Sequence, residues 1–315
     1  MAPGPIAVPA DPPAPVGSTF GRRLTPRLYR AGSGLARALP PRVAVSAAVP
    51  LGAALALALP TRRRTVARHL RRVQGVSPGP GATRHSFDSY ARYWIESFRL
   101  PALSGPEIDA GMWACGLDHL RKALAVGNGA ILALPHLGGW DFGGAWLARR
   151  GHPLTVVVES VEPPELLAWF SALRSDVGLT VIPLGPSAGP AVLRALRANR
   201  AVALLCDRDI GGGGAEVEFF GERTTLPAGP MTLALRSGAA ILPTAVYFEG
   251  TSSHRGVIRP PLPMDRRGSL RDDAARLTQD LATELESLIR AAPEQWHLFQ
   301  PNWPSDPGYA FRTPG

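Results

Sequence analysis

From residue 117 onward, short apolar segments alternate with segments of helical periodicity. The apolar segments are leucine-rich or β-branched, as the buried strands of a parallel sheet are, and they cover residues 130–135, 154–160, 179–184, 201–207 and 239–248. The helical pattern occupies residues 141–151, 164–178, 188–200 and 229–238, and an amphipathic helix follows at 270–292. This alternation predicts an α/β fold in which helices flank a mostly parallel central sheet.

The first 75 residues follow a different pattern. Residues 1–17 are proline-rich and are predicted to be a disordered tail without a cleavable signal. Residues 18–75 hold an amphipathic stretch, an uncharged apolar run from Val43 to Pro60, and then six arginines in TRRRTVARHLRR. Pro50 and Gly52 interrupt the apolar run, so helices that dock in the membrane interface are favoured over one that spans the bilayer. A helical hairpin packed on the domain with a solvated basic face is the alternative.

The remaining residues, 76–315, are predicted to be the α/β domain, and residues 18–75 to form one structural domain with it. Phe87, Tyr90, Trp94 and Phe98 recur at helical spacing near its start. An aromatic stripe of this kind is more often part of a core than of a ligand site, and we interpret it as core.

The composition is basic, with a formal charge of +9 that arginine carries almost alone. Such a surface favours an anionic partner: nucleic acid, anionic lipid or a phosphate-bearing group. Arginine can also be abundant because a genome is GC-rich, so charge alone does not choose among these. Two cysteines, Cys115 and Cys206, argue against a disulfide scaffold and a cysteine-based metal site, and indicate a reducing compartment.

The strongest candidate for chemistry lies in ILALPHLGGWDFGG. His136 comes just after a predicted strand, where the functional groups of parallel sheets gather, and Asp141 opens the next helix. Gly138 and Gly139 allow a tight turn between them. We therefore predict that the Asp141 carboxylate reaches the His136 imidazole and fixes its tautomer for proton transfer. A metal site would need a third ligand at a recognisable spacing, and none is present.

His-x4-Asp alone is a weak signal, but its context resembles a known family. HLGGWD is similar to the His-x4-Asp block of the glycerolipid and lipid A biosynthesis acyltransferases, which implies a glycerolipid-acyltransferase-like fold. The chain looks most like the actinobacterial phosphatidylinositol mannoside acyltransferases. Further blocks agree in order and spacing: TRRRTVARHLRRV, SFDSYARYWIESFRLP, FSALRSDVGLTVIPLG, CDRDIGGGGAEVEFFGERTTLPAGP, GAAILPTAVY and PEQWHLFQPNWP. The resemblance extends over residues 20–305.

The resemblance implies site residues in this chain. His136, Asp141 and Glu216 would be catalytic, with Glu218 as the alternative to Glu216 because both share one face of a strand. Substrate contacts would come from Trp140, Arg174, Arg208 and Glu218, and site walls from the turn at Pro227 and Gly229. The four glycines at 211–214 are not a phosphate loop, because no Gly-Lys-Ser/Thr follows them.

The resemblance also implies a reaction. A long-chain acyl group, with palmitoyl as the expected chain, would pass from the donor substrate acyl-CoA to a mannose hydroxyl of a phosphatidylinositol mannoside. No covalent intermediate and no cofactor would be needed. The absence of a Gly-x-Ser-x-Gly elbow agrees with this, and the absence of a Phe-Pro-Glu-Gly-Thr-Arg block speaks against glycerol phosphate as acceptor. We expect a monomer, peripheral or monotopic on the cytoplasmic face of the cell membrane. The alternatives are a lipid A-type acceptor and a non-catalytic protein that binds anionic lipid or nucleic acid.

Overall fold

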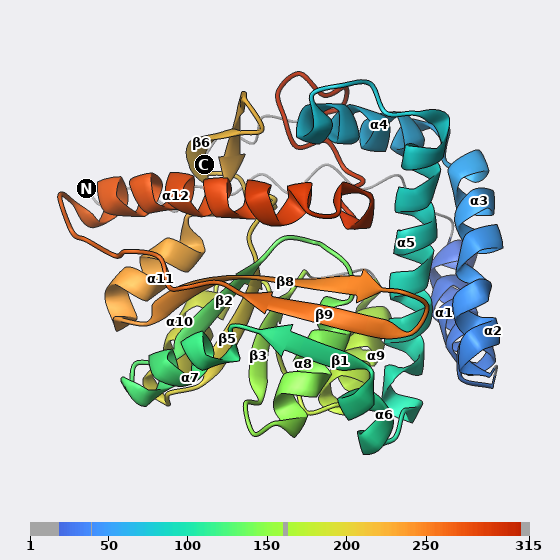
Figure 1. Ribbon diagram of the computed structural model, residues 1–315, viewed down its shortest axis with the longest axis horizontal. Coiled ribbons are helices and arrows are strands. Elements are labelled where there is room, and N and C mark those ends of the chain that lie inside the picture. The colour runs from blue at the N-terminus through green and yellow to red at the C-terminus, as the bar shows by residue number, and fades with distance from the viewer. Residues whose placement is uncertain (1–18, 39, 160–162, 310–315) are drawn as a thin grey trace, which may run out of the picture.

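The computed structural model describes residues 19–38, 40–159 and 163–309, and the predicted tail lies outside them (Figure 1). Its centre is a seven-stranded sheet of order β1-β9-β8-β2-β5-β3-β4. These strands are β1 (Met112–Cys115), β2 (Ala130–Leu134), β3 (Leu154–Val158), β4 (Thr180–Pro183), β5 (Ala201–Leu205), β8 (Ala240–Glu249) and β9 (Ser253–Ile258). All neighbours are parallel except β8 and β9, which confirms the predicted mostly parallel sheet.

Helices cover both faces of this sheet. They are α6 (Gly105–Ala110), α7 (Leu117–Ala125), α8 (Trp140–Arg149), α9 (Pro164–Ser175), α10 (Ala188–Arg197), α11 (Gly229–Ser237) and α12 (Leu270–Arg290). In β2, Ile131 and Ala133 pack in the core under α10, α11 and α12, whereas Leu132 and Leu134 pack under α6, α7 and α8. Both faces of β2 are therefore buried, which explains why its sequence is apolar throughout.

The sequence did not predict two features of the structure: strands β1 and β9, and a separate two-stranded hairpin. Strands β1 and β9 sit at one edge, and β9 carries polar residues such as Ser253 and Arg255 that hide its strand pattern. A separate antiparallel hairpin, β6 (Ala215–Phe219) with β7 (Glu222–Leu226), packs against α12. The hairpin follows β5, so it interrupts the strand–helix alternation at the point where a site residue was expected.

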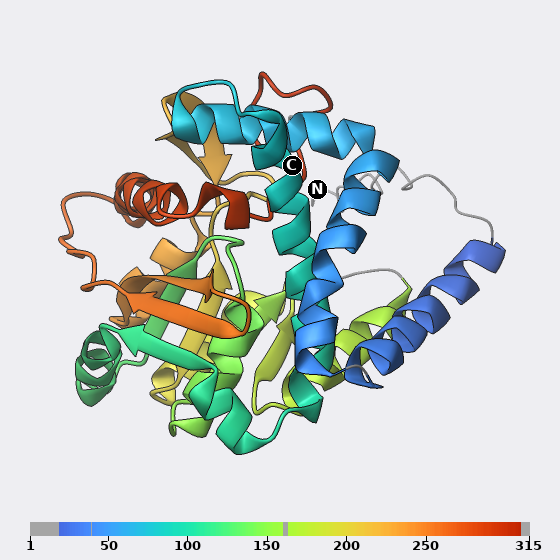
Figure 2. The same ribbon diagram turned by 45° about the vertical axis from the view of Figure 1, so that its right-hand side comes forward.

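The N-terminal helices form a layer beside the sheet. They are α1 (Thr19–Ala38), α2 (Pro41–Ser46), α3 (Ala48–Ala58), α4 (Pro60–Gln74) and α5 (Pro80–Arg99), followed by the short turns η1 (Leu100–Ala102) and, near the C-terminus, η2 (Pro293–Gln295). Both views show α5 between the sheet and α3 (Figures 1 and 2). In the described residues no single helix is long and apolar enough to cross a bilayer, whereas Val43–Ala58 and Pro60–Gln74 pass only as a pair bent by 105°.

The predicted break at Pro50 and Gly52 is wrong. The helix is interrupted only slightly at Ala47, between α2 and α3, and the sharp bend comes at Leu59, between α3 and α4; Pro50 lies in the first turn of α3. A backbone N–H in that turn has no partner within the helix, so proline is tolerated there. Gly52 serves a different purpose, because a Cβ built on it would lie 2.6 Å from the Cα of Asp88 on α5. The glycine lets the two helix backbones approach closely.

This close approach yields a stability prediction. Gly52→Ala forces α3 and α5 apart, and we expect it to lower the free energy of unfolding by about 1–3 kcal/mol, as overpacking does. Gly34 on α1 is the matched control, since a Cβ added there would meet nothing within 4 Å. Gly34→Ala should raise stability by about 0.5–1 kcal/mol, because alanine loses less backbone entropy in a helix. Denaturant melts of both variants test this, and a Gly52→Ala chain as stable as the parent would contradict it.

Candidate active site

His136 meets a carboxylate at the carboxyl ends of two adjacent strands. Strands β2 and β5 are parallel neighbours, paired in register from Ala130–Ala201 to Leu134–Leu205. His136 and Asp207 each lie two residues beyond the last of these pairs, so the register itself brings them together. The Nδ1 atom of His136 is 2.7 Å from Oδ1 of Asp207. The backbone N–H of His136 also donates to Oδ2 of Asp207, at 2.9 Å.

Asp207 is completely buried, and both of its carboxylate oxygens accept hydrogen bonds. Its Oδ2 accepts a second hydrogen bond, from the indole N–H of Trp296 at 2.7 Å. Burial by itself would raise the pKa of Asp207, but the nearby His136 and these hydrogen bonds outweigh burial and lower it. An ionised carboxylate only accepts, so Nδ1 of His136 must carry the proton. In the neutral imidazole the lone pair is then on Nε2, which makes no hydrogen bond to any described residue.

The loop after His136 turns tightly at Gly138. This residue has a φ of 59°, in the region that favours glycine, and a Cβ there would collide with the carbonyl of Val246. Its N–H donates to the carbonyl of Gln295, and the N–H of Gly139 donates to that of Val246. The loop is thus tied both to β8 and to the C-terminal segment, and α8 begins directly after it.

Asp141 does not bond to His136, which corrects the prediction made from the His-x4-Asp spacing. It lies in the first turn of α8, where its carboxylate forms a two-point ion pair with Arg174 on α9, at 2.9 and 3.0 Å. The hydroxyl of Tyr93 on α5 also donates to Asp141, at 2.9 Å. Burial would lower the pKa of Arg174, but Asp141 and Tyr93 outweigh it and raise the pKa. The second carboxylate therefore orients an arginine rather than the histidine.

A cavity of about 990 Å³ opens beside both pairs. His136, Trp140, Asp141, Arg174 and Arg208 line it, as do Pro227 and Gly229 of the predicted turn. Much of its remaining wall is aliphatic and comes from β2, α8, α10 and the segments between these two helices, including Leu132, Leu134, Leu147, Leu154, Leu179 and Val192. A cavity of this size with a few polar groups gathered in one region is typical of a small-molecule site.

Trp140 lies between His136 and α5. Its ring stacks on Tyr93 with centroids 4.1 Å apart and presents an edge contact to His136 at 5.8 Å. Trp94, which we interpreted as core, also lines the cavity and belongs to an aromatic cluster with Phe170 of α9. Phe87, at the other end of the stripe, is completely buried. The aromatic stripe of α5 therefore contributes to the site wall as well as to the core.

The predicted roles of Glu216 and Glu218 do not agree with the structure. Both lie on β6 of the separate hairpin, on the face exposed to solvent, and neither lines the cavity. The inference that they share one face is correct, because residues two apart on a strand point the same way. The face is the wrong one, since Val217 and Phe219 take the buried side. Asp207, eight residues before the hairpin begins, is the acidic residue that pairs with His136.

A second histidine lies behind the first. His297 is buried, its Nε2 is 2.8 Å from the Ser89 hydroxyl, and its Nδ1 has no hydrogen-bond partner among the described residues. Burial and the nearby His136 lower the pKa of His297 to about 3, against a smaller opposing effect of Asp207. His297 is therefore neutral near neutral pH. In the part of the chain that the structure describes, no group of three His, Cys, Asp or Glu side chains is arranged to hold a metal ion.

Known proteins are similar to this chain, and the mycobacterial ones match nearly all of it. Phosphatidylinositol mannoside acyltransferase of Mycobacterium tuberculosis H37Rv is 39% identical over 312 residues, which cover 96% of this chain and 94% of the relative. Its counterpart in Mycolicibacterium smegmatis is 37% identical over 297 residues, or 91% and 94% of the two chains. A lipid A biosynthesis acyltransferase of Haemophilus influenzae is 29% identical over 187 residues, or 58% and 55%.

The profile of one protein family covers the same region. It is described as bacterial lipid A biosynthesis acyltransferase and matches residues 22–305, which include the N-terminal helices, the histidine–aspartate pair and the C-terminal segment. The resemblance inferred from HLGGWD and the blocks around it is thereby confirmed. This match and the extent of the similarity to the mycobacterial relatives establish that the chain belongs to the bacterial lipid A biosynthesis acyltransferase family.

Proposed function

We propose that the protein transfers a long-chain acyl group, palmitoyl in the simplest case, from acyl-CoA to a mannose hydroxyl of a phosphatidylinositol mannoside. The observation that carries the chemistry is the 2.7 Å contact between Nδ1 of His136 and Asp207, which leaves Nε2 free in a residue that lines an apolar cavity. The names of the mycobacterial relatives support the acceptor, because their similarity extends over more than nine tenths of the chain.

In the proposed reaction His136 acts as the general base. Its Nε2 takes the proton of the mannose hydroxyl while the oxygen attacks the thioester carbonyl carbon. The C–O bond forms, the C–S bond breaks, and the departing thiolate receives the proton from His136. Asp207 holds the imidazole in the required tautomer and stabilises the imidazolium that forms in between. The products are an ester and free coenzyme A, and no acyl-enzyme is needed.

Arg174 is proposed to act on the substrate rather than on His136. Its Nε and Nη2 are held by Asp141 and Tyr93, and its Nη1 makes no hydrogen bond to any described residue. A guanidinium fixed on two sides presents its remaining donor in a defined direction. Because Arg174 lines the same cavity as His136, this donor is suited to the oxygen that gains charge in the transition state or to a headgroup phosphate.

The donor's acyl chain is proposed to occupy the aliphatic part of the cavity. Leu147, Leu154 and Leu179 line it on the α8 side of the sheet. An acyl chain gains about 0.8 kcal/mol for each methylene it buries. A polar donor would gain nothing from these aliphatic walls, which is why we favour a lipid-like donor over a polar one.

The N-terminal helices are proposed to dock the protein on an anionic membrane surface from the cytoplasmic side. Large apolar side chains are exposed along this layer: Leu35, Val43, Val49, Leu51, Leu57 and Leu59. The exposed arginines Arg62, Arg63 and Arg64 follow at once on α4. Apolar groups that enter the headgroup region, flanked by arginines that meet lipid phosphates, are the pattern of an interfacial protein.

The central test is an acyl-transfer assay on purified protein. Palmitoyl-CoA with a mannosylated phosphoinositide should release free thiol and give a singly acylated product by mass spectrometry. His136→Ala should lower kcat by about 10²–10⁴-fold, the usual contribution of a general base. Asp207→Asn should lower kcat by about a hundredfold, because the amide no longer fixes the tautomer.

The control for this assay is Asp273→Asn. Asp273 is as buried as Asp207 but accepts hydrogen bonds from Arg267 and Gly268 ahead of α12, away from the cavity. It should lose stability while keeping kcat. Parent-like turnover in folded His136→Ala would refute the mechanism. Transfer to a lipid A-type disaccharide but not to the mannoside would replace the proposed acceptor.

A double-mutant cycle tests the Asp141–Arg174 pair. Asp141→Asn and Arg174→Lys each break the two-point geometry, so each should lower kcat/KM by about tenfold or more, which corresponds to the 1.5–3 kcal/mol of a charged hydrogen bond. The double variant should lose no more kcat/KM than the more damaging of the two single variants, since both changes remove the same interaction. The exposed pair Asp109–Arg149 is the matched control, and its variants should stay near the parent. Additive losses at Asp141 and Arg174 would show that they act separately.

Membrane docking is tested by flotation with vesicles. The protein should float with vesicles that contain phosphatidylglycerol and bind less to phosphatidylcholine alone, with binding weakened by salt. Leu57→Glu should weaken flotation because it puts a charge on the docking face. Val126→Glu is the control, since Val126 is 72% exposed against 75% for Leu57 but lies at the end of α7. Equal flotation of both variants would contradict docking through the N-terminal layer.

A further inference from the structure

The C-terminal segment, residues 295–306, has almost no regular secondary structure, yet it runs directly behind the histidine–aspartate pair. The carbonyl of Gln295 accepts from Gly138, and the backbone N–H of His297 donates to the carbonyl of His136 at 2.7 Å. Both contacts hold the loop that carries the histidine.

The same segment also holds the carboxylate. Trp296 donates its indole N–H to Oδ2 of Asp207, at 2.7 Å. Farther along, the side-chain amide of Asn302 donates to the backbone carbonyl of Asp207, at 3.1 Å. One irregular stretch of chain therefore bonds to both members of the pair. Beyond the 3-10 turn that ends at Gln295 and the bridge between Trp296 and Leu137, it is part of no helix or sheet, so side-chain bonds are needed to hold the rest of it in place.

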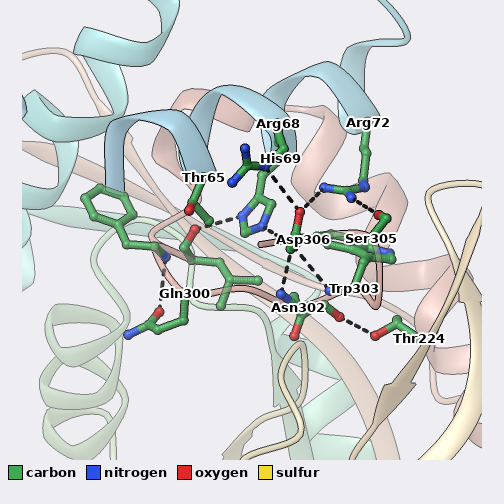
Figure 3. A network of polar contacts seen from close by, with 12 residues as sticks. Thr65, Arg68, His69, Arg72, Thr224, Gln300, Asn302, Trp303, Ser305 and Asp306 are labelled. Atoms are coloured by element: carbon green, nitrogen blue, oxygen red, sulfur yellow. Dashed lines mark hydrogen bonds and ion pairs between the residues drawn. The ribbon is translucent and has the colours of Figure 1, made fainter. Parts of the chain in front are cut away.

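A second histidine–aspartate pair supplies this support. Figure 3 shows Arg68, His69 and Arg72 on one face of α4 reaching Asp306 in the C-terminal segment. Oδ2 of Asp306 lies 3.2 Å from Nε2 of His69, and Oδ1 accepts from Arg72 at 2.9 Å. The other ring nitrogen of His69 lies 2.9 Å from the carbonyl of Leu298, within the same segment.

Asp306 organises the segment as well as anchoring it. Its Oδ2 also accepts the backbone N–H groups of Asn302, at 3.0 Å, and Trp303, at 3.3 Å. Burial would raise the pKa of Asp306, but the bonds from His69 and Asn302 and the charge of Arg72 outweigh it and lower the pKa. Asp306 thus links α4 to Asn302, and Asn302 in turn bonds to the backbone of Asp207.

We propose that Trp296, Asn302 and Asp306, with His69 as their support on α4, are positioning residues that hold the Asp207 carboxylate against His136. The physical reason is that a buried carboxylate follows the donors that surround it, and three of the bonds at Asp207 and the His136 backbone originate in this segment. The part of this proposal that is tested by turnover rests on the proposed function. The hydrogen bond itself can be observed without substrate.

The experiment uses the full chain with two altered residues and two matched controls. Trp296→Phe removes the donor to Asp207 and keeps an aromatic ring, whereas Asp306→Asn removes the charge that anchors the segment. Each should lower kcat by about tenfold or more with KM for acyl-CoA within about twofold, as the loss of a charged hydrogen bond in the transition state does. Each should also shift or broaden the downfield proton NMR signal of Nδ1–H of His136, identified by its loss in Asp207→Asn.

The controls make the same two chemical changes, Trp to Phe and carboxylate to amide, at residues of the same network that do not bond to His136 or Asp207. The Trp303 indole donates to the carbonyl of Phe219, and Glu222 bonds to Arg72 and Ser305. Trp303→Phe and Glu222→Gln should lower the melting temperature while leaving kcat and the NMR signal unchanged. Equal losses of kcat in controls and test variants, or an unchanged NMR signal in folded Trp296→Phe, would overturn the proposal. A shifted NMR signal in Trp296→Phe, alongside a parent that lacks turnover, would support the positioning role and count against the proposed function alone.

Discussion

A carboxylate with no access to solvent holds the centre of this site together. Asp207 keeps its charge because two donors from His136 and one from Trp296 replace the water that burial removes. Each of those donors must lie within hydrogen-bonding distance, so strand β5, the loop after β2 and the C-terminal segment are constrained relative to one another. The proton on Nδ1 of His136, and with it the free lone pair on Nε2, follows from the same constraint.

The register of the sheet explains why this pair forms. Functional groups collect at the carboxyl ends of parallel strands, and here two adjacent strands end at matched positions. The sequence predicted that His136 follows a buried strand and that residues 201–207 form another. It could not predict that these strands are neighbours, because β3 and β4 come between them in the chain but not in the sheet. With that order known, an aspartate at the same offset as His136 would have been the obvious partner.

Prediction was accurate where local pattern decides structure, and failed where distant contacts decide it. The apolar runs of β2, β3, β5 and β8 belong to the interior of the sheet, so composition alone reveals them. The hairpin that carries Glu216 is a local structure too, but only its packing on α12 determines which face is buried. Likewise nothing near Trp296 or Asp306 in the sequence indicates that they contact Asp207 or α4, since those contacts join residues far apart in the chain.

The two aspartates of the site differ in the kind of partner they have, and this separates their roles. Asp207 faces a group that can accept and release a proton, so its negative charge favours proton transfer to His136. Asp141 faces Arg174, which stays protonated throughout, so this pair has no net charge to attract an anion from a distance. The effect we propose for it is one of direction: Asp141 holds the Arg174 guanidinium so that Nη1 points to one place. In the proposed mechanism the His-x4-Asp spacing then has a physical meaning. It puts the proposed base at the strand end, and it puts Asp141, which anchors Arg174, in the first turn of the next helix, on the wall of the same cavity.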